Sequence, residues 1–240
     1  MKELPDGSID MVLCDLPYGV TQNPRDSPIP LALLWNQYKR IVKRNGAIML
    51  FGQGKFFIEL VESNREWYRY DLVWDKVLTT GFLNANRMPL RRHEQIAVFY
   101  DRLPTFNPQF TKGEPLHGKR KAYLKKEHPN HNYGKFRQTE DTRAGSTEKD
   151  PISILRYAKP HPSKAVHPTE KPVALLEYLI RTYTNAGGTV LDNCMGSGSC
   201  AVACIRSGRH YIGYELNEEY FKIAEERIKQ EKIDRYLYNK

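Results

Sequence analysis

The sequence predicts an α/β protein with a mostly parallel sheet, and three observations carry this expectation. Short apolar runs typical of buried strands alternate with segments whose apolar residues recur every three or four positions, as on one face of a helix. Turn-forming residues separate the two kinds of segment. The 240 residues contain no internal repeat and are long enough for one large domain, or one domain with an insert. Strands and helices that alternate at this spacing form βαβ units.

The first half of the chain begins with an apolar run over residues 9–14, which predicts a buried strand. Apolar residues at helical spacing then predict a helix over residues 30–44, which Asn45-Gly46 ends. The next expected elements are a strand over 47–51, a helix after the turn at 52–54, and strands over 70–74 and 95–100.

Residues 81–94 are too polar and too rich in turn formers for a core element, so we expect a loop at the sheet edge. The loop holds three arginines and an exposed aromatic residue, which suit contact with phosphate. An equal alternative is that His93 and Glu94 only fix the start of the next strand.

The second half regains its periodicity near residue 167. Thr169 is expected to cap a helix, with Glu170 in its first turn and an apolar face that includes Leu176 and Leu179. The expected elements after it are a strand over 189–192, a glycine-rich turn, a helix over 200–207, a strand over 211–214 and a helix over 217–230.

Net charge is concentrated in the middle of the chain. The sequence carries 37 Lys and Arg against 28 Asp and Glu, a formal charge of +9. Residues 101–165 hold 14 basic against 7 acidic side chains, whereas residues 1–100 hold 13 against 11 and residues 166–240 hold 10 against 10. A local basic excess is typical of a segment that binds a polyanion, although a solvated basic loop would give the same count. We favour nucleic acid.

Helix and strand periodicity fades over residues 101–163, where prolines interrupt the pattern. Basic clusters at 119–121 and 125–126 alternate with aromatic residues, a mixture that suits contact with a phosphate backbone and stacking on bases. Five histidines between residues 117 and 167 lack the paired spacing of zinc ligands, so we expect no metal site. Residues 152–157 are expected to re-enter the fold as a strand.

The sequence has no apolar run of eighteen residues and no charged-then-apolar leader. We therefore expect a cytoplasmic protein without a membrane partner. Its four cysteines form neither a metal-ligand pattern nor a disulfide pattern and are expected to be core thiols.

The turn Asp15-Leu16-Pro17-Tyr18 follows the first expected strand directly. It places a carboxylate, a rigid turn and an aromatic ring at the carboxyl end of a strand, where open α/β sheets bind ligands. The structural alternative is that Asp15 caps the turn and Tyr18 packs on the core. Short motifs match by chance, so this one needs support from a second site.

The second site is the glycine-rich turn at residues 193–199, between a strand that ends at Asp192 and a helix. Glycines let the backbone approach a ligand, and Glu215, at the end of the next strand, suits the two hydroxyls of a ribose. The pattern predicts a cofactor that contains a nucleoside. Because Gly196-Ser197-Gly198 with Ala201 also imitates the dinucleotide fingerprint, an NAD-dependent enzyme is an alternative at this point.

Together, the two motifs resemble those of the beta-group DNA methyltransferases that modify amino groups and use S-adenosylmethionine. Members of that family carry a D-P-P-Y motif and an F-x-G-x-G motif, and in the beta group the catalytic motif comes first, then the target-recognition segment, then the cofactor motif. The same order stands here. The similarity extends through GFLNANRMPLRRHEQIAVFY, HPTEKPVALLEYLI and GYELNEEYFKIAEERI.

The resemblance implies a Rossmann-like methyltransferase sheet with a circularly permuted motif order and an inserted target-recognition region. It implies a catalytic half over residues 1–100, the target-recognition insert over 101–163 and a cofactor-binding half over 164–240.

In the catalytic half, the resemblance implies that the Asp15 side chain and the Leu16 carbonyl accept two N–H bonds from the amino group of a base. Pro17 completes the turn, and Tyr18 stacks on the base. A base inside a duplex cannot reach such a site, so it has to be flipped out. Adenine N6 is favoured over cytosine N4 as the target.

In the cofactor-binding half, the resemblance assigns the methionine part of S-adenosylmethionine to Asp192 and the following turn, and the ribose to Glu215. It assigns the methionine carboxylate to Thr169 and Lys171, although Lys171 has a structural alternative as a solvated residue at a helix start. The residues of the turn are Cys194, Met195, Gly196, Ser197 and Gly198.

Three departures from the family pattern bear on activity. Leu16 replaces the first proline, which keeps the carbonyl but loosens the turn, since only proline fixes φ. Cys194 stands where the family has phenylalanine, which removes an aromatic wall from the cofactor pocket. The family also has an upstream strand that ends in Gly-Asp, and this sequence begins inside that region. We therefore expect weak binding of S-adenosylmethionine.

The resemblance implies double-stranded DNA as the substrate, and two further expected partners are a cognate restriction endonuclease and a second copy of the chain in a homodimer. An alternative of another class is a catalytically decayed, DNA-binding remnant of such an enzyme. The recognition sequence does not follow from residues 101–163, which match no known code.

Overall fold

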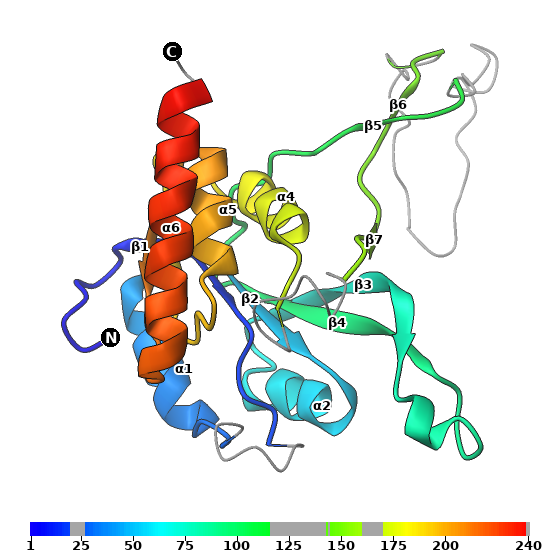
Figure 1. Ribbon diagram of the computed structural model, residues 1–240, viewed down its shortest axis with the longest axis horizontal. Helices are drawn as coiled ribbons and strands as arrows, with labels where there is room; N and C mark the ends of the chain where they lie inside the picture. The colour runs from blue at the N-terminus through cyan, green and yellow to red at the C-terminus, as the bar shows by residue number, and fades with distance from the viewer. Residues whose placement is uncertain (20–26, 116–142, 144, 160–169, 239–240) are drawn as a thin grey trace, which may run out of the picture. The chain divides into compact units, whose positions relative to one another are not determined.

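The protein divides into two compact units in a computed structural model, which describes residues 1–19, 27–115, 143, 145–159 and 170–238 (Figure 1). The larger unit comprises Met1–Asn107 and Ser153–Lys240, and the smaller comprises Pro108–Ile152. In the described part of the smaller unit, β5 (Thr111–Lys112) pairs antiparallel with β6 (Glu148–Lys149). The basic clusters at 119–121 and 125–126 lie outside the described residues. The target-recognition role of the insert stays a prediction.

A mixed sheet forms the centre of the larger unit, and its described strands follow the order β7-β3-β4-β2-β1-β8-β9. β4 is antiparallel to both β2 and β3, whereas the other neighbouring pairs are parallel. This arrangement confirms the predicted α/β class and the mostly parallel sheet. The strands are β1 (Ile9–Cys14), β2 (Val42–Gly52), β3 (Tyr68–Thr80), β4 (Arg91–Phe99), β7 (Ile154–Arg156), β8 (Thr189–Asp192) and β9 (His210–Gly213).

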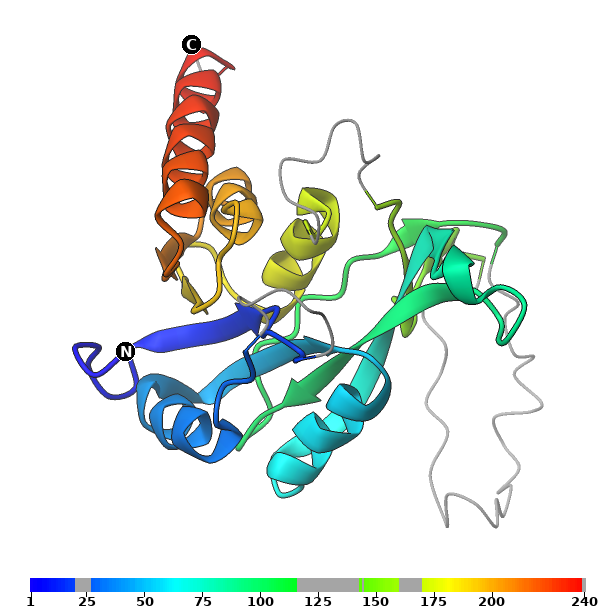
Figure 2. The ribbon, with the colours of Figure 1, turned by 60° about the horizontal axis from the view of Figure 1, so that its bottom comes forward.

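Helices cover both faces of this sheet (Figure 2). The first pair, α1 (Leu31–Ile41) and α2 (Gly54–Ser63), packs on one face, and α4 (Val173–Tyr183) and α5 (Ser199–Ser207) pack on the other. The last helix, α6 (Glu218–Tyr238), packs against α5. The central strand β1 is apolar on both sides because it contributes to both cores, as a strand covered on two faces must.

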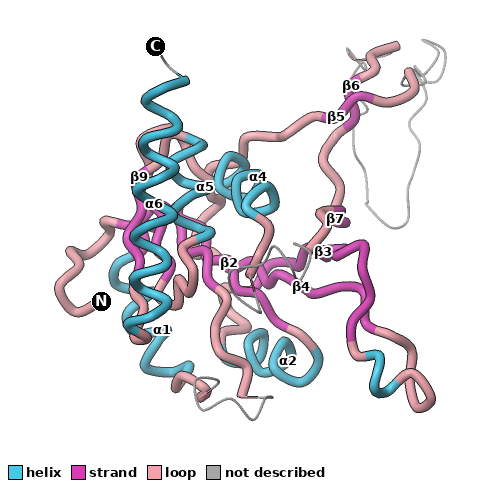
Figure 3. Tube along the Cα trace, in the orientation of Figure 1, coloured by secondary structure: helices cyan, strands magenta, loops and turns pink. Residues whose placement is uncertain are grey.

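The arrangement of the strands brings several chain segments to one end of the sheet, where the parallel strands finish; we call this end the carboxyl edge (Figure 3). The parallel strands β1, β2, β8 and β9 all end there, and the antiparallel strand β4 begins there, since Gln95 pairs with Gly52 at the end of β2. The chain leaves β1 for α1 on one face and leaves β8 for α5 on the other. Such a switch point between neighbouring strands is where open α/β sheets bind ligands.

The predicted helix over residues 30–44 is too long, because α1 ends at Ile41. Val42 instead begins β2 and pairs with Ile9 of β1. Gly46, predicted to end the helix, lies inside β2, where an added Cβ would stand 2.8 Å from the Asp10 carbonyl oxygen. Strand pairing across the sheet therefore overrides the local turn signal.

Two further expectations are corrected. The predicted loop over residues 81–94 is confirmed over 81–90, which hold one 3₁₀ turn and no strand, but β4 already begins at Arg91. Helix α4 begins at Val173 with Pro172 at its N-cap, so Glu170 precedes the helix and does not lie in its first turn. A residue that precedes proline is disfavoured in helical conformation, which excludes Lys171 from the helix. Thr169, the predicted cap, lies outside the described residues.

The cysteines behave largely as predicted. All four are free; Cys14, Cys200 and Cys204 are buried, and Cys194 is half-buried. No helix within the described ranges is long and apolar enough to cross a membrane.

Candidate active site

The two sequence motifs meet at the carboxyl edge of the sheet. β1 and β8 are hydrogen-bonded neighbours, with Val12 opposite Leu191, so the turn after Cys14 lies beside the turn after Asp192. The Tyr38 hydroxyl of α1 donates to Asn193 Oδ1 at 2.5 Å and fixes the start of the second turn. The fold thus brings together two groups of residues that are far apart in the sequence.

The turn after β1 presents polar groups beside stacked aromatic rings. Asp15 Oδ1 accepts a hydrogen bond from the Tyr18 hydroxyl at 2.9 Å, and the Tyr18 ring stacks on Phe56 with centroids 4.7 Å apart. Burial, and then the charges of Asp15 and Glu94, raise the pKa of Tyr18, so its hydroxyl stays a neutral donor.

Leu16 has its side chain in the core between β1 and the helices α1 and α2, where it is 2% exposed. Its carbonyl accepts no hydrogen bond from any described residue. The leucine that departs from the family pattern is therefore held by packing, and it leaves a free acceptor beside Asp15.

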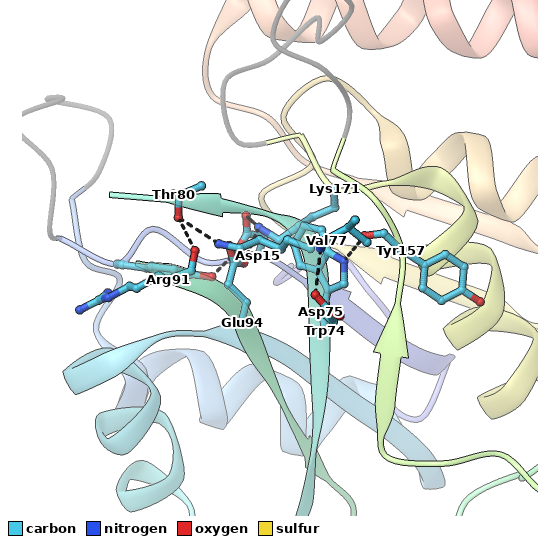
Figure 4. A network of polar contacts seen from close by, with 11 residues as sticks. Asp15, Trp74, Asp75, Val77, Thr80, Arg91, Glu94, Tyr157 and Lys171 are labelled. Carbon is cyan, nitrogen blue, oxygen red and sulfur yellow. Dashed lines mark hydrogen bonds and ion pairs between the residues drawn. The ribbon is translucent and has the colours of Figure 1, made fainter. Parts of the chain in front are cut away.

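A chain of charged side chains runs from this turn to the two strands β3 and β4 (Figure 4). The Lys171 ammonium donates to Asp15 Oδ2 and lies 3.4 Å from Glu94 Oε2. The other oxygen of Glu94, Oε1, lies 3.2 Å from the ammonium of Lys76. The side chains of Lys76 and Lys171 are only 4% and 10% exposed, so Glu94 neutralises two buried cations. We call Lys76, Glu94, Lys171 and Asp15 the ionic chain.

Mutual attraction keeps Lys171 and Glu94 charged despite burial. Burial alone would lower the pKa of Lys171, but Asp15 and Glu94 together raise it. Burial alone would raise the pKa of Glu94, but Lys171 and Lys76 lower it. The Lys171 ammonium also lies 5.0 Å from the ring centroid of Phe51. The alternative of Lys171 as a solvated helix-start residue is therefore wrong.

The turn after β8 has the backbone shape of a ligand-binding loop. Gly196 and Gly198 have positive φ values of 51° and 80°. A Cβ on Gly198 would stand 3.0 Å from the Cβ of Ala224 in α6, so this position also lacks room for a side chain. The turn is consequently held close to α6, and no side chain projects from these two positions.

Glu215 follows β9 and is fixed by two backbone donors. Its Oε2 accepts the Gly196 N–H at 2.9 Å, and its Oε1 accepts the Asn217 N–H at 2.8 Å. Each carboxylate oxygen can accept more than one hydrogen bond, so both retain capacity for a further donor. A fixed carboxylate acceptor of this kind beside a glycine turn fits the ribose diol of S-adenosylmethionine.

Arg227 of α6 ties the glycine turn to the segment that carries Lys171. Its Nη1 donates to the carbonyl and the hydroxyl of Ser197, at 2.9 and 2.8 Å, and its Nη2 donates to Glu170 Oε1 at 2.8 Å. Glu170 directly precedes Lys171. Glu170 is linked to the glycine turn through Arg227, and Lys171 binds Asp15, so this short segment connects the two turns.

Sequence reasoning missed Lys76, Glu94 and Arg227. Glu94 carried a signal, because a carboxylate beside His93 at a strand start was already a candidate for a polar contact. Lys76 and Arg227 carried none, since each is one basic residue among many. Within the described ranges, no group of three or more His, Cys, Asp or Glu is placed to hold a metal ion.

Asp192 ends β8 and is buried below the glycine turn. Its Oδ1 accepts the Cys194 N–H at 3.1 Å. Burial is the main cause that raises the pKa of Asp192 from 3.8 to about 7, with smaller contributions from Asp15 and Glu215. The carboxyl group is thus poised to change its charge near neutral pH.

A family model described as DNA methylase matches residues 9–226, and thus both turns and all members of the ionic chain. This chain belongs to the DNA methylase family. Its motif order, with the Asp15 turn before the glycine turn, is that of the beta group of amino-directed DNA methyltransferases.

One curated relative and two solved structures are similar to this chain over most of its length, and the structures share its fold. M.HpaI, a type II methyltransferase of Haemophilus parainfluenzae, is 25% identical over 96% of this chain and 71% of its own length. The crystal structure of the M1.HpyAVI–SAM complex shares 24% identity at a TM-score of 0.61, with coverage of 95% of this chain and 90% of that one. The cytosine-N4-specific PvuII DNA methyltransferase, 14% identical, has a TM-score of 0.62 and coverages of 96% and 86%. Other curated relatives are matched over as little as 24% of their length.

Glu94→Gln is expected to destabilise the fold by about 3–5 kcal/mol, because it leaves the buried Lys76 without its carboxylate partner. Urea unfolding at pH 7 measures the loss. The matched control is Glu66→Gln, which removes an exposed partner of Lys39 at 3.6 Å and should change stability by less than about 1 kcal/mol. Equal losses in the two variants would contradict the importance of the ionic chain.

Asp192→Asn is expected to flatten the pH dependence of stability between about pH 4 and pH 7. In this window the folded protein holds a proton on Asp192 that the unfolded chain has lost. Ionisation of Asp192 in the unfolded chain therefore lowers the stability of the fold as the pH rises. The asparagine cannot ionise, and its stability relative to the unchanged protein should rise by up to about 4 kcal/mol across the window. Denaturant unfolding at several pH values tests this, with the exposed Asp6→Asn as control; a difference independent of pH would refute it.

Proposed function

We propose that this protein transfers a methyl group from S-adenosylmethionine to the exocyclic amino group of a base flipped out of double-stranded DNA. Adenine N6 is favoured over cytosine N4. The observation that carries the proposal is the meeting of the Asp15 turn and the glycine turn at the ends of the neighbouring strands β1 and β8. A methyl donor and an acceptor base held in these two turns would lie side by side, which supplies proximity and orientation.

The Asp15 turn would activate the amino nitrogen, which is a poor nucleophile because its lone pair is delocalised into the ring. The Asp15 carboxylate and the Leu16 carbonyl accept its two N–H bonds, which turns the lone pair out of conjugation and stabilises the positive charge that develops on nitrogen. Two hydrogen bonds already reach Asp15, from Tyr18 and Lys171, but a carboxylate has about four acceptor positions and retains room for the base.

A cleft beside Glu94 is the space that we assign to the flipped base. Its volume is about 270 Å³, and it opens at the carboxyl end of β2 between α2 and β4. The residues that line it are Gln53, Gly54, Arg91, His93, Glu94 and Gln95. Polar side chains around a small cleft suit hydrogen bonds to the edge of a base.

The cofactor supplies an electrophilic methyl group on a sulfonium. We assign its ribose to Glu215 and its methionine part to Asp192 and residues 194–198. Thr169 and Lys171 stay the predicted partners of the methionine carboxylate; for Lys171 this role requires the ammonium to be shared with, or released from, Asp15. Double-stranded DNA is the proposed substrate, and the cognate endonuclease and the homodimer stay predictions.

Expression of the protein in a host that lacks DNA methylation is expected to introduce N6-methyladenine into its DNA. An Asp at the first position of the motif favours adenine, whereas the PvuII relative is cytosine-N4-specific, so the base has to be measured. A dot blot with antibodies to N6-methyladenine and N4-methylcytosine separates the two outcomes. Absence of both bases would favour the decayed, DNA-binding alternative.

Asp15→Ala is expected to reduce methyl transfer by at least about 100-fold, because it removes one of the acceptors that orient the amino group. DNA affinity should stay within about threefold, since the role proposed for Asp15 is contact with the flipped base and not with phosphate. Transfer of a tritiated methyl group and a gel-shift titration measure the two quantities. Asp6→Ala, which removes an exposed carboxylate with 76% of its side chain accessible, is the control. Retained transfer by Asp15→Ala would exclude the assigned role.

A further inference from the structure

Residues 77–91 form an arm that extends β3 and β4 beyond the body of the sheet (Figures 1 and 3). Thr80 pairs with Arg91 across the arm, and a short 3₁₀ helix over Phe82–Asn84 forms its tip. Gly81 before this helix has a φ of 84°, which permits the sharp turn. The arm is therefore a hairpin whose tip is the predicted loop.

The base of the arm is held in a strained conformation. Val77 has a φ of 67°, a left-handed conformation that is unfavourable for a β-branched residue. Its N–H donates to Asp75 Oδ1 at 2.9 Å (Figure 4). Arg92 binds both oxygens of Asp75, at 2.8 and 3.0 Å. A bulge of this kind redirects a strand pair, and the surrounding contacts maintain the strain.

The same base is connected to the ionic chain. Lys76, directly before Val77, lies 3.2 Å from Glu94, and its ammonium also donates to Thr80 Oγ1 at 3.5 Å. Glu94 in turn pairs with Lys171, which binds Asp15. The arm thus leaves the sheet at the edge that carries the Asp15 turn, and its direction is set by the residues that hold Asp15.

The tip of the arm exposes large apolar side chains beside unpaired cations. Phe82 is 78% exposed and Leu83 is 86% exposed. Residues 77–92 contain three arginines and no acidic residue. Within the described ranges, neither Arg87 nor Arg91 makes an ion pair with a carboxylate. An apolar tip flanked by free guanidinium groups complements a polyanion with an apolar interior, which is the chemistry of duplex DNA and not that of an acidic or apolar protein surface.

We propose that the arm is a DNA wedge: Phe82 and Leu83 enter the base stack at the place that the flipped base vacates, while Arg87 and Arg91 bind the flanking phosphates. This inference rests on the proposed function, because it requires a duplex whose base reaches Asp15. Extrusion of a base costs stacking and pairing energy, and apolar side chains inserted between base steps compensate for part of that loss.

The test uses the double variant Phe82→Ala/Leu83→Ala, whose changes lie at exposed positions and should leave thermal unfolding unaltered. Single-molecule sequencing of DNA methylated by the unchanged protein first maps the target site. Methyl transfer to a duplex with this site is then compared with transfer to the same duplex carrying an abasic position opposite the target base. The variant is expected to lose about tenfold or more on the intact duplex and about twofold or less on the abasic one, where the base is already unpaired.

Leu103→Ala is the matched control. Leu103 is 78% exposed, as is Phe82, but it follows the carboxyl end of β4 and so lies at the opposite edge of the sheet. This variant should match the unchanged protein on both duplexes. Equal activity of the double variant and the control on the intact duplex would overturn the wedge.

Two further readouts separate the wedge from other outcomes. The fluorescence of 2-aminopurine in a duplex reports unstacking without methyl transfer, so a protein that binds DNA but transfers no methyl group still tests the arm: the signal should rise with the unchanged protein and not with the double variant. Absence of both transfer and duplex binding would refute the proposed function and the wedge together.

Sedimentation analysis covers the alternative occupant, a second copy of the chain. A dimer that the double variant converts to monomer would assign the tip to that contact and overturn the wedge.

Discussion

The ionic chain of Lys76, Glu94, Lys171 and Asp15 is the interaction on which the site depends. It joins the end of β1, the strands β3 and β4, and the segment before α4 at one edge of the sheet. Removal of these charges from water is costly, and only close pairing of opposite charges offsets that cost. The positions of the Asp15 turn and of the hairpin that extends from β3 and β4 are therefore coupled, because a shift of either one would leave a buried charge without its partner.

The two halves of the site are linked a second time through adjacent residues. Glu170 binds Arg227, which holds the glycine turn at Ser197, whereas Lys171 binds Asp15. The segment of Glu170 and Lys171 therefore connects the two turns. Since Asp192 lies below the same edge with a pKa of about 7, the charge of the site also depends on pH in the neutral range.

Local patterns predicted the elements of the sheet better than their ends. The strand over 189–192 agrees with β8 residue for residue, because its apolar run lies between turn formers that the fold also uses as turns. Residues 42–44 were assigned to a helix and form strand, since pairing with β1 outweighs helical periodicity. The polar sequence of residues 81–94 lacks a core-facing pattern and predicts a loop, and residues 81–90 form the tip of a hairpin that Asp75, Lys76 and Arg92 stabilise at its base.

The sequence by itself determined the fold class, the two turns at strand ends and the family that their order implies, because apolar periodicity and glycine positions act over a few neighbouring residues. Only the tertiary structure decided the partners of the charged side chains. Lys171 and Asp15 are 156 positions apart, and Arg227 and Glu170 are 57 apart. Each could pair with many opposite charges, and the packing of the strands and helices selects which ones meet in a buried place where a pair is strong.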